Sequence, residues 1–362
     1  MRQGFVNTIV YFYIFVCIAL LVFNIIYIFN SKRRSKYSKR QIDVMGTLQK
    51  KWMSEAEKEA GLPEEEKRAI VKKLRKISWL LAFQEVLLKA EKEQSSGKMA
   101  CFFRYISPVI YELAMYYQKR PVVEKSFFAY FSSVHLAVAP KSYERLGETF
   151  LLYLENSTVY CRENVLHALY ALGAEDALER AFEQFQVKGW YHQPKLISDG
   201  MAGFQGDKEK LVRRLWTKNK KWPDFINISL VQFMANQPED FSDIMLPALK
   251  ESPRELRFVV IRYFQRHPKE AAKEILLNIL NQNGDLAIAA ASALEKYPGE
   301  DTEAALKKGL QSTNWYVRHN AAVSLLKLGI SESEKAELLS NKDKYAREMF
   351  AYVLESENRR QK

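Results

Sequence analysis

The chain has 362 residues, which is long for one ordinary globular domain and fits either two domains or an extended array of repeats. Its composition is 48% hydrophobic and 27% charged, which excludes a wholly disordered protein. With only 14 glycines and 11 prolines, long helices are expected rather than a β-sandwich or barrel with many tight turns. Three cysteines, Cys17, Cys101 and Cys161, are too few for a disulfide framework or a four-cysteine zinc site.

The net charge of +12 is distributed unevenly along the chain. Residues 1–40 contain seven basic and no acidic residues, which leaves 48 basic and 43 acidic residues in 41–362. A high isoelectric point would normally suggest a nucleic-acid partner. Because more than half of the excess lies beside one apolar segment, the charge indicates a membrane instead.

Residues 5–29 form that apolar segment, which contains no charged residue: FVNTIVYFYIFVCIALLVFNIIYIF. A helix of this length is about 37 Å long, enough to cross a hydrocarbon core of about 30 Å. The alternative is a cleaved signal peptide, whose apolar stretch would be shorter and followed by small residues. Residues 1–30 are therefore predicted to be a retained transmembrane anchor.

Basic residues follow the anchor directly. They are Lys32, Arg33, Arg34, Lys36, Lys39 and Arg40, against Arg2 alone on the other side. The positive-inside rule predicts a single-pass protein of the cell membrane with the N-terminus outside and residues 31–362 in the cytoplasm. The same six residues are expected to contact anionic lipid. Two glycosylation sequons, at Asn156 and Asn227, would then remain unused.

The segment after the anchor is predicted to have three parts. Residues 31–62 read as a basic juxtamembrane segment and a polar connector. Pro63 and the acidic residues that follow it suit a helix start, and helical periodicity continues without a breaker to Glu93. We expect divergent helical pairs over 63–145 and repeats over 146–358, with no strands.

Residues 101–134 are rich in aromatic side chains, which suggest either a recognition groove or a packed pair of helices. Packing is the favoured interpretation, because aromatic residues at helical spacing usually lie in a core. The residues are Phe102, Phe103, Tyr105, Tyr111, Tyr116, Tyr117, Phe127, Phe128, Tyr130 and Phe131.

From about residue 146 the sequence repeats with a period near 31 residues. The clearest copies, 150–176 and 304–329, each contain a helix, a short polar turn and a second helix rich in Ala and Leu that ends in Gly. Such a period with two helices per unit predicts an all-α solenoid. Equivalent positions, 29 to 33 residues apart, are Arg162, Gln193, Ile226, Arg257, Ala287, Arg318 and Arg347.

The turn before the second helix resembles that of HEAT repeats, in which Asp or Asn precedes a Val-Arg pair. Asn314-Trp315-Tyr316-Val317-Arg318 and Leu256-Arg257 carry the resemblance best. Gln193 and Ala287 depart from it, and the register at Ile226 stays open. The resemblance covers 146–356 well and 63–145 weakly. It implies a right-handed α-solenoid of HEAT-like helix pairs, preceded here by one transmembrane helix, and leaves the function open.

The sequence contains no phosphate-binding loop, nucleophile elbow, kinase signature, HExxH or CxxC motif. Cys101 and Cys161 are predicted to be small helix-packing residues. Acidic pairs such as Glu239-Asp240 and Glu300-Asp301 are attributed to helix starts. The histidines, expected to be surface or packing residues, are His135, His167, His192, His267 and His319. We expect no enzymatic activity, no cofactor, no metal and no small-molecule substrate.

One local charge cluster lies at 208–222, KEKLVRRLWTKNKKW, with seven basic residues and one acidic residue. The period places 208–216 on an outer helix, with Leu211, Leu215 and Trp216 packed inward, and 218–222 in the next turn. A solvated helix face is the ordinary interpretation. The alternative is a site for a lipid headgroup, an acidic partner segment or a phosphate. That candidate anion- or partner-binding site comprises Arg213, Arg214, Lys218, Lys220, Lys221 and Trp222.

Two functions of different classes follow from these features. The first is a membrane-anchored cytoplasmic scaffold or adaptor, which presents its HEAT-like surface to membrane-associated protein partners as an accessory factor of a membrane-bound assembly. The alternative is a nucleic-acid-binding protein resembling the DNA alkylation repair glycosylases, which 314–318 loosely favours. The nearly neutral charge of 41–362 argues against nucleic acid. An enzyme built on the same scaffold would need an acid, base or nucleophile set that the sequence lacks.

Overall fold

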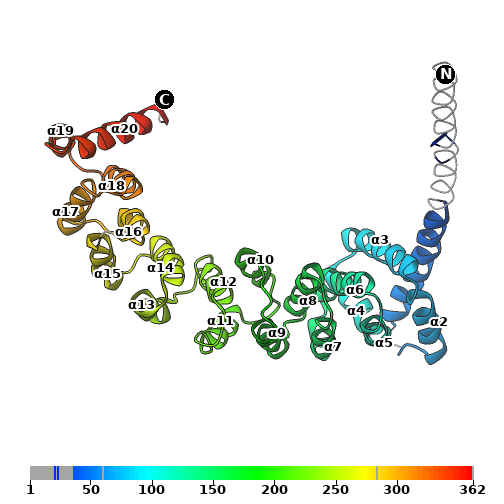
Figure 1. Cartoon of the computed structure of the whole chain (residues 1–362). Coiled ribbons are helices and arrows are strands. Elements are labelled where there is room, and N and C mark those ends of the chain that lie inside the picture. The colour runs from blue at the N-terminus through cyan, green and yellow to red at the C-terminus, as the bar shows by residue number, and fades with distance from the viewer. Residues whose placement is uncertain (1–19, 22, 24–35, 59–60, 283, 361–362) are drawn as a thin grey trace, which may run out of the picture. The chain divides into compact units, whose positions relative to one another are not determined.

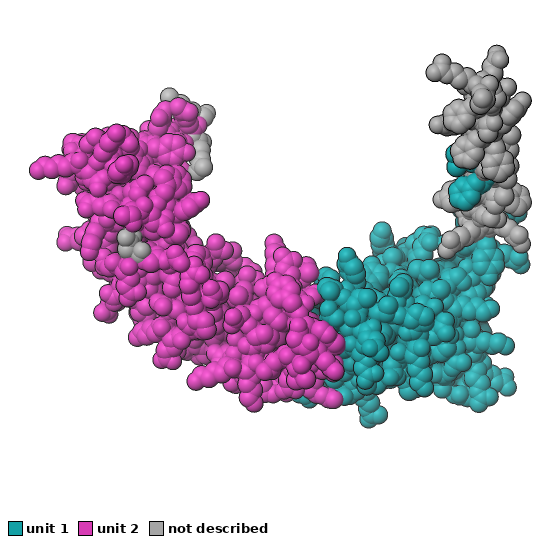
Figure 2. Space-filling model, in the orientation of Figure 1, with its two compact units in different colours: residues 1–178 teal, residues 179–362 magenta. Residues whose placement is uncertain are grey.

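The computed structural model describes residues 20–21, 23, 36–58, 61–282 and 284–360. All regular structure in these residues is helical, which confirms the all-α class (Figure 1). The chain divides into two compact units, residues 1–178 and 179–362 (Figure 2). The predicted anchor falls almost wholly outside the described residues. Within the part of the chain that is described, no helix has both the length and the apolar character needed to cross a bilayer.

The first unit contains the helices up to α8, and α9 (Glu175–Lys188) crosses the division between the units. A helix over 36–56 precedes the following elements. These are α2 (Glu64–Leu74), α3 (Ile77–Glu93), α4 (Ser96–Tyr105), α5 (Ser107–Gln118), α6 (Val122–His135), η1 (Leu136–Val138), η2 (Pro140–Ser142), α7 (Leu146–Tyr153) and α8 (Val159–Leu172).

The second unit continues with short helices joined by short turns. They are α10 (Pro194–Met201), α11 (Lys208–Trp216), α12 (Asp224–Met234), α13 (Ser242–Glu251), α14 (Arg254–Arg266), α15 (Glu270–Asn281), α16 (Ala287–Ala293), η3 (Leu294–Lys296), α17 (Glu300–Gly309), α18 (Trp315–Leu328), α19 (Glu332–Leu339) and α20 (Lys344–Arg360).

The polar connector predicted over 41–62 is wrong for its first part, because residues 36–56 form a helix. Its buried side chains recur at intervals of three or four residues, which is one face of a helix. Trp52 packs edge-on against Phe83 of α3, with ring centroids 6.2 Å apart, and its indole N–H donates to Glu66 of α2 at 3.1 Å. The buried face comprises Gln41, Met45, Gln49, Trp52 and Ala56.

The continuous helix expected from 64 to 93 is interrupted after Leu74. Lys76 adopts an extended backbone, with φ −89° and ψ 121°, so that α2 and α3 fold back as a packed pair. Tyr117 of α5 stabilises the C-terminal end of α2, because its hydroxyl donates to the Leu74 carbonyl at 2.7 Å. Burial of apolar side chains on both helices therefore overrides a periodicity that local propensity alone would continue.

The aromatic residues of 101–134 form a packed core in the first unit. Phe128 stacks against Phe131 and Tyr117, with ring centroids 6.0 Å and 5.0 Å away, and all three side chains are fully buried. Phe102 and Phe103 are also buried, whereas Tyr130 is exposed. The packing interpretation is therefore confirmed. The same region corrects the expectation for Cys101, which lies on the exposed side of α4, while Cys161 is buried as predicted.

Helices of each unit pair with their neighbours in two rows. In the second unit each helix from α11 to α19 with an odd number packs against the even-numbered helix that follows it, and each even-numbered helix from α10 to α20 packs against the next even-numbered one. In the first unit α3, α6 and α8 form one row and α2, α5 and α7 the other. Close approach needs small residues, since a Cβ added to Gly309 of α17 would lie 3.3 Å from that of Ala321 on α18.

The arginines at the positions that the sequence predicts to be equivalent, which we call the repeat arginines, share one position in their helices and one kind of contact. Arg162, Arg257, Arg318 and Arg347 are each the fourth residue of an even-numbered helix, α8, α14, α18 and α20. Each donates to a backbone carbonyl in the last turn of the preceding helix or in the turn that leads into its own helix. The contacts run from Arg162 to Ser157 (3.0 Å), Arg257 to Leu249 (2.9 Å), Arg318 to Ser312 (2.7 Å) and Arg347 to Asn341 (2.6 Å).

The same contact settles the register that the sequence left open at Ile226. The fourth residue of α12 is Asn227, and its side-chain amide donates to the carbonyl of Asn219 at 2.8 Å. Asn227 rather than Ile226 is thus the equivalent of the repeat arginines. The corresponding residues of α10 and α16 are Ile197 and Ala290, which carry no side-chain donor.

Candidate functional site

The segment 208–222 has the secondary structure that its sequence predicts. Helix α11 ends at Trp216, and a turn leads to α12. Leu211, Leu215 and Trp216 are buried, as expected from their helical spacing. The cations of the segment do not all point into solvent, however, and their surroundings decide what the site can bind.

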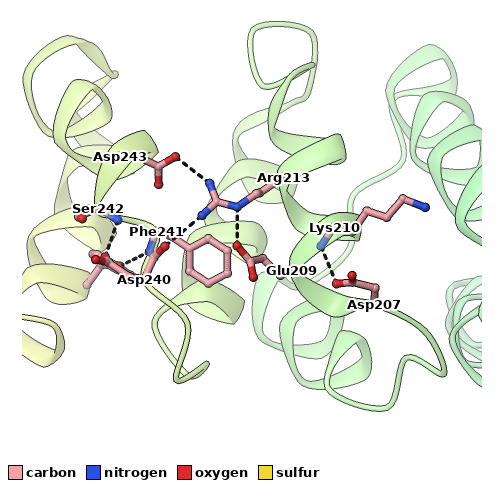
Figure 3. A network of polar contacts seen from close by, with 9 residues as sticks. Asp207, Glu209, Lys210, Arg213, Asp240, Phe241, Ser242 and Asp243 are labelled. Atoms are coloured by element: carbon pink, nitrogen blue, oxygen red, sulfur yellow. Dashed lines mark hydrogen bonds and ion pairs between the residues drawn. The ribbon is translucent and has the colours of Figure 1, made fainter.

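Arg213 is held by groups from two neighbouring elements (Figure 3). Its Nε donates to Glu209 Oε1 at 2.8 Å, and its Nη1 donates to Asp243 Oδ2 of α13 at 2.7 Å. Its Nη2 donates to the Asp240 carbonyl at 3.0 Å, and the guanidinium lies 5.1 Å from the centroid of the Phe241 ring. Hydrogen bonds from Arg213 to Glu209 and Asp243 raise the pKa of its guanidinium. This arginine ties α11 to α13 and is not available to a ligand.

Asp240 extends this network to the next pair of helices. Lys269 forms an ion pair with it at 2.7 Å, and the Ser242 backbone N–H donates to its other oxygen at 2.9 Å. The hydrogen bond from Lys269 and those from Ser242 hold the pKa of the Asp240 carboxyl well below its usual range. The acidic pair Glu239-Asp240 thus serves the start of α13, as the sequence suggested.

Arg214 and Lys218 both bind Glu179 of α9. The Arg214 Nε donates to Glu179 Oε2 at 2.6 Å, and Lys218 forms a short contact with the other carboxylate oxygen. Lys218 also pairs with Glu183 at 2.9 Å. Burial raises the pKa of the Glu179 carboxyl, but hydrogen bonds from Lys218 and Arg214 outweigh it and lower the pKa overall. Two more of the predicted anion-binding cations are therefore neutralised by carboxylates of a neighbouring helix.

Lys220 and Lys221 are the two cations of the predicted site that remain exposed with no ion pair to any described residue. Trp222 is 5% exposed, and its indole N–H donates to the Leu215 carbonyl at 2.8 Å. The structure thus separates the six predicted residues into a structural set and an exposed lysine pair. Anion binding by this segment remains a prediction, now resting on Lys220 and Lys221.

A groove of about 550 Å³ opens beside Lys220, which is one of its lining residues. We call it the turn groove, because it lies between the turn that precedes α12 and the turn that precedes α14. Trp216 and Trp222 line its apolar part together with residues of α13, and Lys220, Asp224 and Glu251 are its charged groups. With one cation against two carboxylates, the groove as a whole does not favour an anion.

Asn227 lines the turn groove with one unused acceptor. Its side-chain nitrogen donates to the Asn219 carbonyl, whereas its buried Oδ1 has no hydrogen-bond partner. A buried polar atom without a partner is rare in folded proteins, and binding of a donor would satisfy it. Asn227 is 6% exposed, which leaves Asn156 as the sequon asparagine at the surface.

The juxtamembrane residues fall partly within the described chain. Lys36, Lys39 and Arg40 lie on the helix 36–56 and are exposed, whereas Lys32, Arg33 and Arg34 lie outside the described residues. Their contact with anionic lipid stays a prediction.

The turn 314–318, which loosely favoured nucleic acid, has a structural explanation. Asn314 Oδ1 caps α18 by accepting from the Tyr316 N–H at 2.9 Å, and Arg318 binds the carbonyls of Ser312 and Thr313. Trp315 and Tyr316 are exposed, and His319 stacks on Trp315 with ring centroids 5.1 Å apart. In the part of the chain that the structure covers, no three His, Cys, Asp or Glu side chains lie close enough together to hold a metal ion.

Sequence reasoning missed the carboxylates that neutralise the cluster. Asp243 lies 30 residues after Arg213, and Glu179 lies 35 residues before Arg214, so each pair is separated by about one repeat. Opposite charges at the repeat period were therefore a usable signal. The unpaired acceptor of Asn227 had no signal in the sequence.

Comparison of the sequence with protein-family models found no matching family, and a comparison with curated proteins found no match. We therefore infer the function from the geometry of the described residues.

Proposed function

We propose that this protein is a membrane-tethered scaffold, a right-handed solenoid of HEAT-like helix pairs that binds cytoplasmic partner proteins at the membrane. It acts as an accessory factor of a membrane-bound assembly and carries out no chemistry of its own. The two rows of helices and the arginine contacts at the start of α8, α14, α18 and α20 support the HEAT-like assignment.

The observation that carries the proposal is the turn groove. Consecutive helix pairs, α11–α12 and α13–α14, contribute its walls, so its shape depends on the stacking that a solenoid provides. Its apolar floor, mixed charges and unsatisfied Asn227 acceptor suit a folded or extended protein segment better than a uniformly charged polymer.

Tethering gives such a scaffold its advantage. The apolar segment 5–29 and the basic residues after it support a tether that holds the remainder of the chain at the cytoplasmic leaflet. A tether raises the effective concentration of the scaffold for partners in the same membrane without any new contact. A groove that binds its partner only weakly can then still be occupied by that partner.

The test is crosslinking of the full chain in membranes, followed by affinity purification and identification of the captured proteins. Three variants accompany it. The first lacks residues 1–30, the second carries Lys220→Glu and Lys221→Glu at the turn groove, and the third carries Lys188→Glu and Lys342→Glu. Lys188 and Lys342 are exposed residues outside the groove, so the third variant matches the charge change of the second.

We expect the first variant to leave the membrane fraction and lose its partners. The second should stay in the membrane and lose the same partners, and the third should keep them. Equal capture by the groove variant and its control would show that the turn groove is ordinary surface. Capture that is unaffected by removing residues 1–30 would overturn the tethered function.

A further inference from the structure

A second groove lies on the row of even-numbered helices in the second unit. It has a volume of about 420 Å³, and we call it the α12 groove because α12 forms its centre between α10 and α14. It shares no residue with the turn groove. Its lining residues are Lys195, Ser198 and Asp199 from α10, Gln232, Ala235 and Asn236 at α12, and Val259, Arg262 and Arg266 from α14.

The charged groups of the α12 groove are mainly cationic. Lys195 and Arg262 are exposed and form no ion pair with any described residue. Arg262 approaches the face of the Phe258 ring, 5.9 Å from its centroid, which holds the guanidinium at the groove. Arg266 is held by hydrogen bonds to Asn236 and to the Ala235 carbonyl. Asp199 is the one acidic residue in the lining, so three cations face one carboxylate.

Several other basic residues of the second unit are instead neutralised within the fold. Arg213, Arg214 and Lys218 are each neutralised by carboxylates about one repeat away. Arg254, on the same helix as Arg262, pairs with Asp285 at 2.6 Å. Cations left without partners in a groove retain their full attraction for a carboxylate, and a guanidinium can bind one through two parallel hydrogen bonds.

The floor of the groove adds a feature that points to a peptide. The Gln232 side chain lines the groove, and its carboxamide oxygen has no hydrogen-bond partner. The terminal torsion of a glutamine side chain is broad, so this oxygen can turn toward a donor without breaking a hydrogen bond that it already makes. An extended peptide offers a row of backbone N–H donors to this oxygen, whereas a fully ionised phosphate offers no donor.

We propose that the α12 groove binds an acidic segment of a partner protein. Carboxylates of the segment contact Lys195 and Arg262, and a backbone N–H of the segment donates to Gln232. The proposal rests on the scaffold function and names the chemistry of one class of partner. Nucleic acid is the less favoured ligand, because 41–362 carries 48 basic against 43 acidic residues and so lacks the broad positive field that a polyphosphate needs.

The experiment uses the full chain in detergent micelles and a fluorescein-labelled dodecapeptide of alternating glutamate and serine as the probe. Fluorescence anisotropy measures its binding at low and high salt. A dodecapeptide of alternating lysine and serine and a labelled dodecathymidylate serve as the comparison probes. We expect the glutamate peptide to bind the chain and the binding to weaken at high salt.

The deciding variants remove equal charge at two places. Lys195→Gln with Arg262→Gln empties the groove of its unpaired cations, and we expect at least tenfold weaker binding of the glutamate peptide. Lys250→Gln with Arg254→Gln removes two cations from α13 and α14 outside the groove, and we expect less than a twofold change. Lys195→Glu with Arg262→Glu should gain affinity for the lysine peptide, which an unfolded protein would not do.

If both glutamine variants weakened binding of the glutamate peptide equally, only the net charge of the chain would matter. That result would overturn the proposal. Tighter binding of the oligonucleotide than of the glutamate peptide, lost in the same groove variant, would overturn it in favour of nucleic acid. Failure of the full chain to capture any membrane partner in the crosslinking test, with peptide binding intact, would instead count against the scaffold function alone.

Discussion

The repeat arginines explain why one position is recognisable in four of the predicted copies. Arg318 binds the carbonyls of Ser312 and Thr313, which lie in the turn between α17 and α18. One nitrogen of the guanidinium, Nη1, donates to both carbonyls, at 2.7 Å and 3.1 Å. Asn227 fulfils the same function in α12 with a shorter side chain.

We predict that Arg318→Ala lowers the free energy of unfolding by about 1–3 kcal/mol, the range for hydrogen bonds that involve a charged group. Lys250→Ala, at an exposed position without an ion pair, should change it by less than about 0.5 kcal/mol. Urea denaturation measures both. Hydrogen exchange of the amides of 313–318 should accelerate in the first variant. Unchanged exchange there would show that the arginine does not hold the turn.

The Ala- and Leu-rich second helix of the copy 304–329 predicts that its neighbouring leucines, Leu325 and Leu326, are both buried. Leu325 is fully buried, but Leu326 is half-buried, so the expectation is wrong for Leu326. The two side chains point about 100° apart on the helix, so that one can be fully buried while the other is partly exposed.

Leu325→Ala should therefore cost about 2–5 kcal/mol, as a cavity-forming substitution in a packed site does. Leu326→Ala should cost about 1 kcal/mol, near the centre of the distribution for single substitutions. Thermal unfolding followed by circular dichroism compares the two. A larger loss for Leu326→Ala than for Leu325→Ala would contradict the assigned faces.

The sequence alone predicted buried side chains of α11, but not the ion-pair partners of its arginines. Helical spacing located Leu211, Leu215 and Trp216 correctly, because apolar side chains must face a neighbour. The partners of Arg213 and Arg214 depend on which helices are adjacent in space. Single-sequence periodicity does not fix that adjacency until the register of every copy is known.

At the scale of elements, α19 depends on one capping arrangement. Ser331 and Glu334 form a capping box, and Lys307 of α17 pairs with Glu334 at 2.7 Å. The hydrogen bond from Lys307, followed by those from Ser331, lowers the pKa of the Glu334 carboxyl to about 2. A carboxyl whose pKa is lower in the folded state stabilises the fold above its unfolded pKa and loses that contribution as the pH falls.

We predict that the thermal midpoint of the parent exceeds that of Glu334→Gln at pH 7, and that the difference closes as the pH falls from about 4.5 toward 2. Glu337→Gln is the matched control, since Glu337 is exposed on the same helix without an ion pair. Thermal scans at several pH values measure the difference. A gap that stays constant through this window would show that the charge of Glu334 does not stabilise α19.

Lys220 and Lys221, in the turn before α12, allow lipid binding to be tested with two substitutions that break no ion pair to a described residue. Substitution of all four of Arg213, Arg214, Lys220 and Lys221 would also break ion pairs between helices. We predict that Lys220→Ser with Lys221→Ser weakens salt-sensitive binding of a 36–362 fragment to anionic vesicles by up to about 2 kcal/mol. Vesicle co-sedimentation measures it.

Arg213→Ser with Arg214→Ser is the counterpart of that variant. It should lower the thermal midpoint, because Asp243 and Glu179 lose their partners. Its vesicle binding per folded molecule should change little. If this variant instead lost vesicle binding while remaining folded, the anion site would lie on α11 and not at the lysine pair.

The sequence predicts a helix well where one face of that helix is wholly apolar, and poorly where polar side chains interrupt that face. The helix 36–56 buries two glutamines in its stripe, which made the segment look like a polar connector. The break between α2 and α3 at Lys76 carries no glycine or proline. The break forms because α2 packs against α5 and α3 against α6. These contacts between distant parts of the chain are not visible in the local sequence.

At the scale of the whole molecule, the topology remains a prediction that one surface residue can report. Asn156 is an exposed sequon asparagine in the turn before α8. With residues 31–362 in the cytoplasm, we expect Asn156 to stay unglycosylated in microsomes and protease added outside to leave this region undigested. Neutral substitutions of the six basic residues in 32–40 should raise the inverted fraction, which would then acquire a glycan.

A variant with Asn156→Gln and Asn227→Gln controls for modification elsewhere. Glycosylation of the parent chain at Asn156 in most molecules would reverse the assigned orientation. The scaffold proposal would then concern partners on the other side of the membrane.

The arginine contacts have a consequence for how this chain can change over time. Each arginine recognises main-chain oxygens, which every amino acid supplies, and not the side chains of the turn. The turns can therefore accumulate substitutions, or be exchanged between copies by recombination, without loss of their anchoring contact. Diversity in what the molecule recognises can thus be generated at these loops, while the framework beneath them is inherited intact.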